Sequence, residues 1–462
     1  MTDFDTYLSP FTWRYGSDDM RSLWSEETKI RTWRKLWTAL ARAQLEFGLV
    51  SEAQVKDLEA YQDDVNMARM HELEAETHHD VVAAIRAYAE QASLGGAVLH
   101  MGATSSDIKD NADALLMKQS VTLLLSRLQD LLAHFAEKID AWADVPIMAF
   151  THLQPAEPTT LGYRFAVYGR DLLDDWLHLK DLERSIKAKG FSGAVGTGAT
   201  FQDAIGTDNV YAFEQALQRE MEIPFFDVTT QTYPRKQDLE IISVLSGLGA
   251  TISKFAFDLR LLQSPVIGEL REPFGKKQVG SSAMPFKRNP IKAEKICSLA
   301  RLLPAHVDTA WQNTANALLE RTLDDSANRR TIIPESFLIC DELLITANKI
   351  INGLDVNKSA MVLNLQKYGV FAGIEPLLMN LVSAGADRQV MHEKLRQHAM
   401  KAWDAVNKGD PNPLLEILCQ DETLASYIPV EKIRALLDTH AYTGMASQKA
   451  KQFAKKIFES IN

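Results

Sequence analysis

Apolar side chains recur at steps of three and four along most of this chain, which is the spacing that places them on one face of an α-helix. One such stretch runs from about residue 111, where Leu124, Leu128 and Leu131 share a face, and another runs from about residue 238 to Leu262. Each would form a helix of about 25 residues, roughly twice the average length. Helices of that length favour an elongated bundle in which each apolar stripe packs against several neighbours.

Turn and cap residues mark shorter helices between these stretches. Trp33 and Trp37 lie on one face of a helix that Gly48 ends, and Ser51 followed by Gln54 fits a capping box for the next helix. β patterns are rare, and residues 224–228 are the one short extended piece that we expect. The pattern as a whole predicts an all-α fold.

Loops divide the predicted helices into three domains. We expect an N-terminal helical domain over residues 1–104, a central long-helix bundle domain over residues 105–354, and a C-terminal helical domain over residues 355–462. Gly and Pro in the segment 409–413 mark a loop inside the last domain. At about 150 residues per domain, a chain of 462 residues is expected to hold roughly three domains.

Composition narrows the class of protein. The net charge of −11 argues against a general nucleic-acid binder, which would carry a basic face. Cys297, Cys340 and Cys419 lie far apart, which argues against a disulfide framework and indicates a reducing, cytoplasmic compartment. The polar N-terminus is not a secretory signal, and no apolar run approaches the roughly 18 residues that a membrane span needs. We therefore expect no membrane association.

The segment from Gly275 to Pro290 has an unusual composition. It holds two glycines, two prolines, two adjacent serines and four cations, namely Lys276, Lys277, Lys287 and Arg288. Glycines give such a loop mobility and prolines anchor it, so that it could close over a ligand and exclude water. The alternative is a solvated basic loop between helices, which does not account for the paired serines and both prolines together.

Residues 280–290 resemble the signature of the fumarase/aspartase superfamily, G-S-S-x-M-P-x-K-x-N-P. All eight fixed positions of the eleven are present. The resemblance implies an all-helical enzyme that eliminates fumarate from a succinyl substrate, with Ser281 as the catalytic base. Lys287 and Asn289 would stabilise the doubly charged aci-carboxylate that forms when the proton leaves.

Further segments resemble those of the adenylosuccinate lyase family within this superfamily, and they occur in the expected order. The resemblance extends from about residue 9 to about residue 454. It implies elimination of fumarate from adenylosuccinate and from succinylaminoimidazole carboxamide ribotide. The matching segments are residues 9–15, 79–81, 100–105, 150–156, 231–236, 320–330 and 442–448.

His152, within the segment FTHLQPA, matches the general acid of the family. A histidine suits this role because its ordinary pKa lies near the operating pH. The alternative is a buried histidine that is hydrogen-bonded to its own loop.

Thr104 and Ser105 match a pair that holds a succinyl carboxylate, although such residues also commonly cap a helix.

The resemblance places His79 and Asp80 beside the substrate, without a metal. For His78 a structural role is the simpler interpretation, because adjacent helical residues point about 100° apart and do not easily chelate one ion. No metal-binding spacing of the H-E-x-x-H kind occurs.

The arginines of residues 320–330 suit bidentate recognition of a phosphate. The family alignment implies that Arg321, Ser326 and Arg330 bind the 5′-phosphate end, together with Arg14 and Tyr15. The alternative is a solvated charged face balanced by acidic neighbours. Gln231 and Thr151 are weaker candidates for substrate binding, since small polar loop residues are often turn formers.

The resemblance also implies a small-molecule nucleotide substrate, no cofactor, and a homotetramer with active sites shared between subunits. One departure is Lys295, which stands where some relatives carry Arg. Two alternatives remain: another fumarate-releasing enzyme such as argininosuccinate lyase, and a non-catalytic helical structural relative. The segment 320–330 speaks against the first, and the presence of both Ser281 and His152 speaks against the second.

Overall fold

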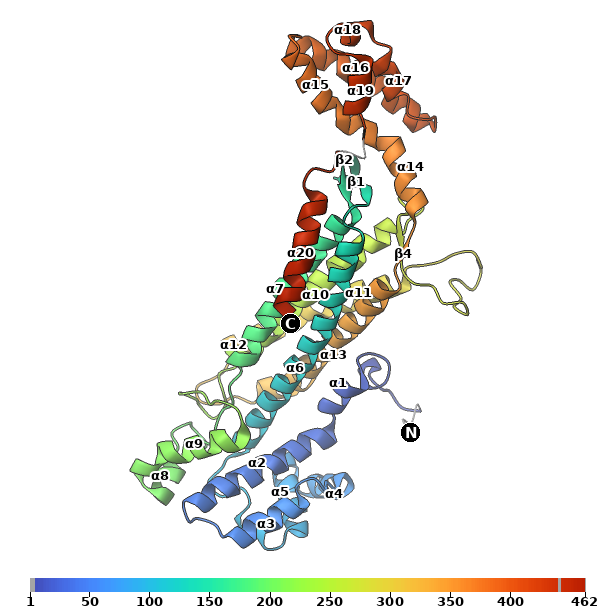
Figure 1. Ribbon diagram of the computed structural model, residues 1–462. Helices are drawn as coiled ribbons and strands as arrows, with labels where there is room; N and C mark the ends of the chain where they lie inside the picture. Colours follow the sequence, from blue (N-terminus) through green and yellow to red (C-terminus); the bar gives the residue numbers. More distant parts are fainter. Residues whose placement is uncertain (1–4, 439–441, 462) are drawn as a thin grey trace. The chain divides into compact units, whose positions relative to one another are not determined.

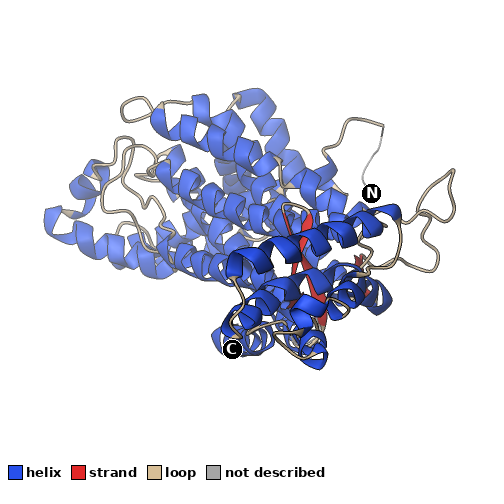
Figure 2. Ribbon diagram, turned by 90° about the horizontal axis from the view of Figure 1, so that it is seen from above, coloured by secondary structure: helices blue, strands red, loops and turns tan. Residues whose placement is uncertain are grey.

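The computed structural model describes residues 5–438 and 442–461. The first four residues, on which part of the N-terminal prediction rests, lie outside the described part. Two compact units make up the chain, and each is assembled from segments that are distant in sequence. Helices dominate both units, as the blue ribbons of Figure 2 show. The first unit comprises Met1–Arg127, Asp175–Ala250 and Ser298–Ile345, and the second Leu128–Asp174, Thr251–Cys297 and Thr346–Asn462.

The all-α fold class predicted from the periodicity is therefore confirmed. Figure 1 labels the elements along the chain. The predicted domain boundaries after residues 104 and 354 stay a prediction. The helices that begin in the first unit are α1 (Asp18–Leu23), α2 (Glu26–Glu46), α3 (Glu52–Tyr61), α4 (Met67–Thr77), α5 (Asp80–Gln91), α6 (Ser105–Ala141), α8 (Ala199–Ile205), α9 (Val210–Met221), α10 (Lys236–Leu262), α12 (Leu302–Ala315) and α13 (Asp324–Asn352).

Local sequence signals account for the helix ends. Ser51 and Gln54 form the predicted capping box at the start of α3, with the side chain of each accepting from the backbone amide of the other. The side chain of Ser25 caps α2 in the same way, by accepting from the amide of Thr28. Trp33 and Trp37 of α2 are buried, as their shared face predicts.

Helix α6 begins six residues earlier than the apolar pattern indicates. Its first turns bury polar side chains, among them Asp107, Asp110 and Asn111, and these interrupt the apolar period. Further along, the predicted stripe is buried at Leu124, Leu128 and the positions that follow. The early start brings the first turn of α6 to the candidate site.

Helix α10 is long and apolar enough to cross a membrane by length and composition alone, which the sequence reading did not anticipate. The core helix of a protein outside the membrane meets the same criterion. In α10, 44% of the most apolar 18-residue window is buried inside the protein.

The sequence reading missed an antiparallel hairpin in the second unit, formed by β1 (Pro146–Thr151) and β2 (Gln154–Thr160). Prolines at 155 and 158 disfavour a strand, but a two-stranded ribbon has free edges that tolerate them. A second small ladder joins β3 (Leu270–Arg271) to β4 (Asp355–Val356). The extended piece expected at 224–228 amounts to a single bridge between Phe225 and Ala188.

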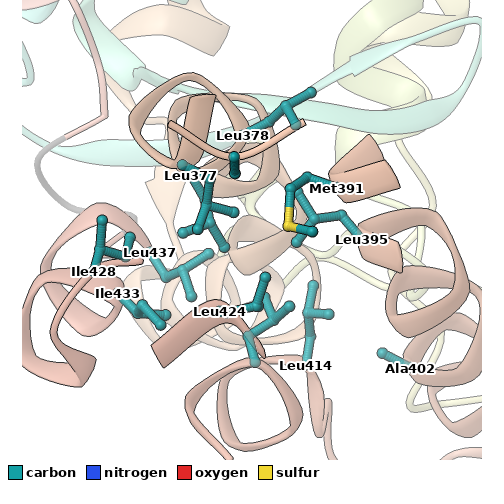
Figure 3. Packing of buried hydrophobic residues seen from close by; sticks show 13 residues of the cluster. Leu377, Leu378, Met391, Leu395, Ala402, Leu414, Leu424, Ile428, Ile433 and Leu437 are labelled. Carbon is teal, nitrogen blue, oxygen red and sulfur yellow. The ribbon is translucent and has the colours of Figure 1, made fainter. Parts of the chain in front are cut away.

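The C-terminal helices of the second unit surround a core of their own. Figure 3 shows the side chains of Leu377, Leu395, Leu424 and Ile433 converging from different helices. The predicted loop at 409–413 separates two of these helices. The remaining helices are α7 (Leu161–Ser185), α11 (Ile291–Leu299), α14 (Lys358–Tyr368), α15 (Ile374–Ser383), α16 (Arg388–Lys408), α17 (Leu414–Cys419), α18 (Glu422–Ala425), α19 (Val430–Leu436) and α20 (Ala446–Ile461).

Candidate active site

A cavity of about 590 Å³ lies within the first unit. Its wall comes from the α4–α5 junction, the first turns of α6, the start of α13 and residues of α2. Its volume falls in the range of small-molecule sites, about 300–1,000 Å³. Eight residues that the sequence predicts for substrate binding line this one cavity: His79, Asp80, Thr104, Ser105, Gln231, Arg321, Ser326 and Arg330.

Thr104 and Ser105 stand at the start of α6. Their hydroxyls do not cap this helix. The carboxylate of Asp107 accepts from the amide of Thr104 at 2.8 Å. Neither hydroxyl makes a hydrogen bond recorded in the described part of the chain. Both are therefore open to a ligand at a helix N-terminus, which favours anions.

The junction between α4 and α5 presents three consecutive polar residues. His78 ends α4 in the left-handed conformation, with φ 53°, which is a structural role, and its side chain also lines the cavity. The His79 ring caps α5 by accepting from the amide of Val82 at 3.4 Å. Asp80 is the first residue of α5. The backbone turn at His78 thus brings these side chains to the cavity together.

Two cations hold the carboxylate of Asp80. Lys109 Nζ and one terminal nitrogen of Arg330 lie 2.8 and 3.0 Å from the same oxygen, Oδ2, and the amide of Val81 donates to Oδ1. Burial by itself would raise the pKa of Asp80, but the hydrogen bond and charge of Lys109 outweigh it and the net pKa is lowered. Asp80 is therefore an anion at neutral pH.

The start of α13 is not the solvated charged face that the sequence left open. Asp325 and Arg329 are buried, and Arg321 lies 2.9 Å from Asp325 one helical turn away. Ser326 and Arg330 line the cavity. Arg321 and Arg329 line the cavity as well, so this segment contributes three arginines to its wall.

A buried ion-pair network forms part of this wall, and sequence reasoning missed it; four of its residues line the cavity, namely Asp110, Asp113, Arg235 and Arg329. Arg235 bridges Asp110 at 2.9 Å and Asp325 at 2.6 Å, which ties α10 to α6 and α13. Arg329 bonds Asp238 at 2.7 Å and Asp113 at 3.1 Å. The only signal in the sequence was a set of charged residues inside helical stripes, and their partners are up to 216 positions away.

The network also holds the first turns of α6, α10 and α13 in fixed positions relative to one another. Burial would raise the pKa of Asp325, but the charges of Arg235 and Arg321 outweigh it and lower the net value. A buried network of paired charges costs desolvation and is sensitive to the loss of any one partner. It positions the side chains that face the cavity.

Arg14 and Tyr15 belong to the first unit but do not line the cavity. Arg14 is exposed and its guanidinium lies 5.5 Å from the ring centroid of Trp13. The ring of Tyr15 lies 5.8 Å from that of Phe11. The structure therefore does not bring these two predicted residues to the others.

In the second unit, His152 stands at the tip of the β1–β2 hairpin. Thr151 pairs with Gln154, so the connection is the two-residue turn His152-Leu153, with φ values of 51° and 60°. Positive φ at both positions defines a type I′ turn, which usually carries Asn-Gly. The strain of two non-glycine residues there is typical of functional positions. The turn exposes the imidazole, so His152 is not the buried histidine of the alternative.

The predicted loop lies between β3 and α11, and Figure 1 shows it as an extended excursion beside β4. Ser281 Oγ accepts from the amides of Ala283 at 3.3 Å and Met284 at 3.1 Å. Asn289 bonds the carbonyl of Gly280 at 3.1 Å and so closes the loop at its base. Lys287 is exposed. Two amides directed at Ser281 Oγ would stabilise a negative charge there.

No hydrogen bond or ion pair between His152 and the Ser281 loop is recorded in the described residues. The predicted catalytic residues thus stand on two separate elements of the second unit. Among residues 5–438 and 442–461, no group of three or more His, Cys, Asp or Glu side chains is arranged to hold a metal ion.

Comparison with known proteins shows the family to which the chain belongs. Residues 11–302 match the Lyase family, and residues 374–453 match the family described as Adenylosuccinate lyase C-terminus. The adenylosuccinate lyase of Schistosoma mansoni is 38% identical, with 98% of this chain and 95% of that protein covered. The chain belongs to the adenylosuccinate lyase family. The resemblance predicted from the motifs is thereby confirmed.

Other members of the adenylosuccinate lyase family are similar over the same span. The protein of Saccharomyces cerevisiae is 35% identical, with 99% of this chain and 95% of that protein covered. The protein of Archaeoglobus fulgidus is 33% identical, with 98% and 99% covered.

Solved structures share the fold. The 3-carboxy-cis,cis-muconate lactonizing enzyme of Pseudomonas putida has a TM-score of 0.86 at 23% identity, with 98% of this chain and 99% of that chain covered. A fumarate lyase from Mesorhizobium sp. BNC1 has a TM-score of 0.84 at 24% identity, with 97% and 99% covered. At these identities the likeness concerns the fold alone.

Proposed function

We propose that this chain is a C–N lyase that eliminates fumarate from adenylosuccinate, giving AMP, and from succinylaminoimidazole carboxamide ribotide, giving the free carboxamide ribotide. The observation that carries the proposal is the single cavity onto which eight motif residues converge, in a chain of the adenylosuccinate lyase family. Hydroxyls at a helix N-terminus and arginines in the same cavity suit a ligand that carries carboxylates and a phosphate.

The reaction needs a base, an acid and stabilisation of a transient dianion. Ser281 takes the proton from the carbon next to a carboxylate, and the electron pair of that C–H bond forms the C=C bond of fumarate. The electron pair of the C–N bond leaves with the nitrogen atom, and His152 protonates that nitrogen. Lys287 and Asn289 stabilise the aci-carboxylate intermediate in a water-poor site. The elimination involves no net redox change, so we assign no cofactor.

Activation of Ser281 is the demanding step, because a serine alkoxide is a poor resting species. The two amides that donate to Ser281 Oγ support the proposal, since donors directed at an oxygen favour its charged form. Closure of the loop over the substrate would strengthen them by excluding water.

We propose further that the active site is completed in a homotetramer by residues from different subunits. The motif residues lie on different elements: eight line the cavity, His152 is in a hairpin turn, and Ser281 is in a loop. Large apolar side chains on the long helices are also exposed in the single chain and would be buried by assembly. These include Val167, Leu177, Phe257, Leu261 and Trp311.

Complementation between inactive variants tests the shared site. Ser281→Ala and His152→Ala should each lose activity, whereas a mixture unfolded and refolded together should regain part of it. Mixed tetramers would contain some sites with both residues intact. Failure to recover activity, in a mixture that light scattering shows to be tetrameric, would place both residues in one subunit's site.

The direct test of function follows fumarate release from purified protein supplied with adenylosuccinate. We expect release with adenylosuccinate and none with argininosuccinate or aspartate. Turnover of either of the latter substrates in its place would move the chain to another branch of the superfamily.

We also propose a cytoplasmic location, which the three free cysteines support, and cell fractionation tests it.

A further inference from the structure

Lys109 is a cavity residue that no motif marked. It lies on α6 one helical turn after Ser105, and residues four apart share a face of a helix. Both line the cavity. Its side chain is 29% exposed, so the ammonium is partly desolvated yet open to a ligand.

The partners of Lys109 come from two other elements. Asp80 opens α5 and Arg330 belongs to α13, and the two cations meet at a single carboxylate oxygen, Asp80 Oδ2. The side chain of Arg330 is 56% exposed, whereas that of Asp80 is 16% exposed. The carboxylate is thus the buried anchor, and the two cations are the more accessible groups.

Lys109 and Arg330 have fewer carboxylate partners than the arginines of the buried network. Arg235 and Arg329 each have two carboxylate partners. Lys109 and Arg330 share one carboxylate, and that carboxylate is kept ionised because its pKa is lowered. The remaining neighbour of Asp80 on the same turn is His79, whose ring nitrogen lies 3.7 Å away. Two accessible cations thus converge on one carboxylate oxygen at the cavity wall.

We propose that Lys109 and Arg330 form a cation pair that binds an anionic group of the substrate, with Asp80 holding both side chains in position while the cavity is empty. The inference rests on the proposed function and adds to it a binding residue, Lys109, outside the motifs. The shared chemistry is that of a phosphate or a carboxylate, both of which accept from two converging cations.

The test compares Lys109→Met with Lys109→Arg and with Lys118→Met, a matched lysine on the same helix that does not line the cavity. Loss of a hydrogen bond to a charged group should raise KM by about 10- to 100-fold. kcat should change much less, because the contact is made in the ground state as well as in the transition state. Lys109→Arg should restore most of the affinity, and Lys118→Met should resemble the unaltered enzyme.

Calorimetric binding of products identifies the anionic group. Weaker binding of AMP to Lys109→Met, with adenosine unaffected, assigns the pair to the phosphate. Weaker binding of fumarate assigns it to a carboxylate. Unchanged affinity for both, together with an unchanged KM, overturns the inference while leaving the lyase activity intact. Absence of fumarate release from the unaltered enzyme would instead reject the proposed function, and AMP binding would still report on Lys109.

Discussion

Lys189 and Asp107 form an ion pair in the first unit in which both side chains are completely buried. The other oxygen of Asp107 accepts from the amide of Thr104 at the start of α6. Lys189 also donates to Ser192 Oγ at 3.0 Å and to the carbonyl of Gly193 at 3.2 Å. The pair therefore fixes the first turn of α6, and with it the hydroxyls of Thr104 and Ser105, to a loop more than 80 residues away.

Lys189→Met should lower the free energy of unfolding by about 3–5 kcal/mol, because it leaves the Asp107 carboxylate buried without a counter-charge. Urea unfolding measures the change. The double variant Asp107→Asn with Lys189→Met should recover part of the loss, since it removes the unpaired charge. A midpoint unchanged by the single substitution would show that water reaches Asp107 and that the pair contributes little.

His152→Asn should separate folding from chemistry at the hairpin turn. Asparagine is favoured at the first position of a type I′ turn, so the melting temperature of the variant should equal that of the unaltered enzyme. kcat should fall by at least about 10²-fold, because asparagine cannot donate a proton to the leaving nitrogen. Leu153→Gly is the control, and we expect it to keep both activity and stability. Full activity of His152→Asn would remove the histidine from the mechanism.

Stability should depend on pH through His100. Burial lowers its pKa from 6.5 to about 4, with a smaller contribution from His79, and its Nδ1 accepts from the indole of Trp37. Because the folded pKa is depressed, the contribution to stability is complete above pH 6.5 and is lost as the pH falls towards 4. The loss is at most about 3–4 kcal/mol, at about 1.4 kcal/mol per pKa unit.

His100→Asn tests this assignment. Asparagine tolerates the positive φ of 63° and can accept from the indole, but it does not titrate in this range. The fall in melting temperature between pH 6.5 and pH 4 should therefore be smaller in the variant. His392→Asn, at an exposed position of α16, serves as the control. Identical pH profiles for His100→Asn and the unaltered enzyme would contradict the assignment.

Gly280→Ala should impair the loop without unfolding the protein. A Cβ atom at this position would lie 1.9 Å from the carbonyl oxygen of Lys287, so the two arms of the loop must separate. A displacement of about 1 Å at reacting groups costs up to about 10²-fold in rate, and kcat should fall accordingly. Gly275→Ala is the matched control, because its Cβ would meet only the Gln278 side chain at 3.8 Å. Equal kcat values for the two variants would indicate that the loop adopts another conformation during turnover.

Much of the fold could be predicted because long helices leave a strong periodic signal. The stripes at Leu124 and Leu245 are buried as expected, and the capping box at Ser51 is formed. The hairpin was missed because Pro155 and Pro158 argue against a strand, and its turn carries His152-Leu153 in place of Asn-Gly. Local rules fail there because both the strand and the turn carry residues that those rules disfavour.

The sequence by itself determined the helical class, the family and the identity of the candidate residues, because periodicity and motifs are properties of neighbouring positions. Only the tertiary structure decided which of those residues share a cavity, and that Lys109 and the buried network of Arg235 and Arg329 join them. The physical reason is that a buried charge is stable only beside its counter-charge, and these counter-charges come from helices that are far apart in sequence.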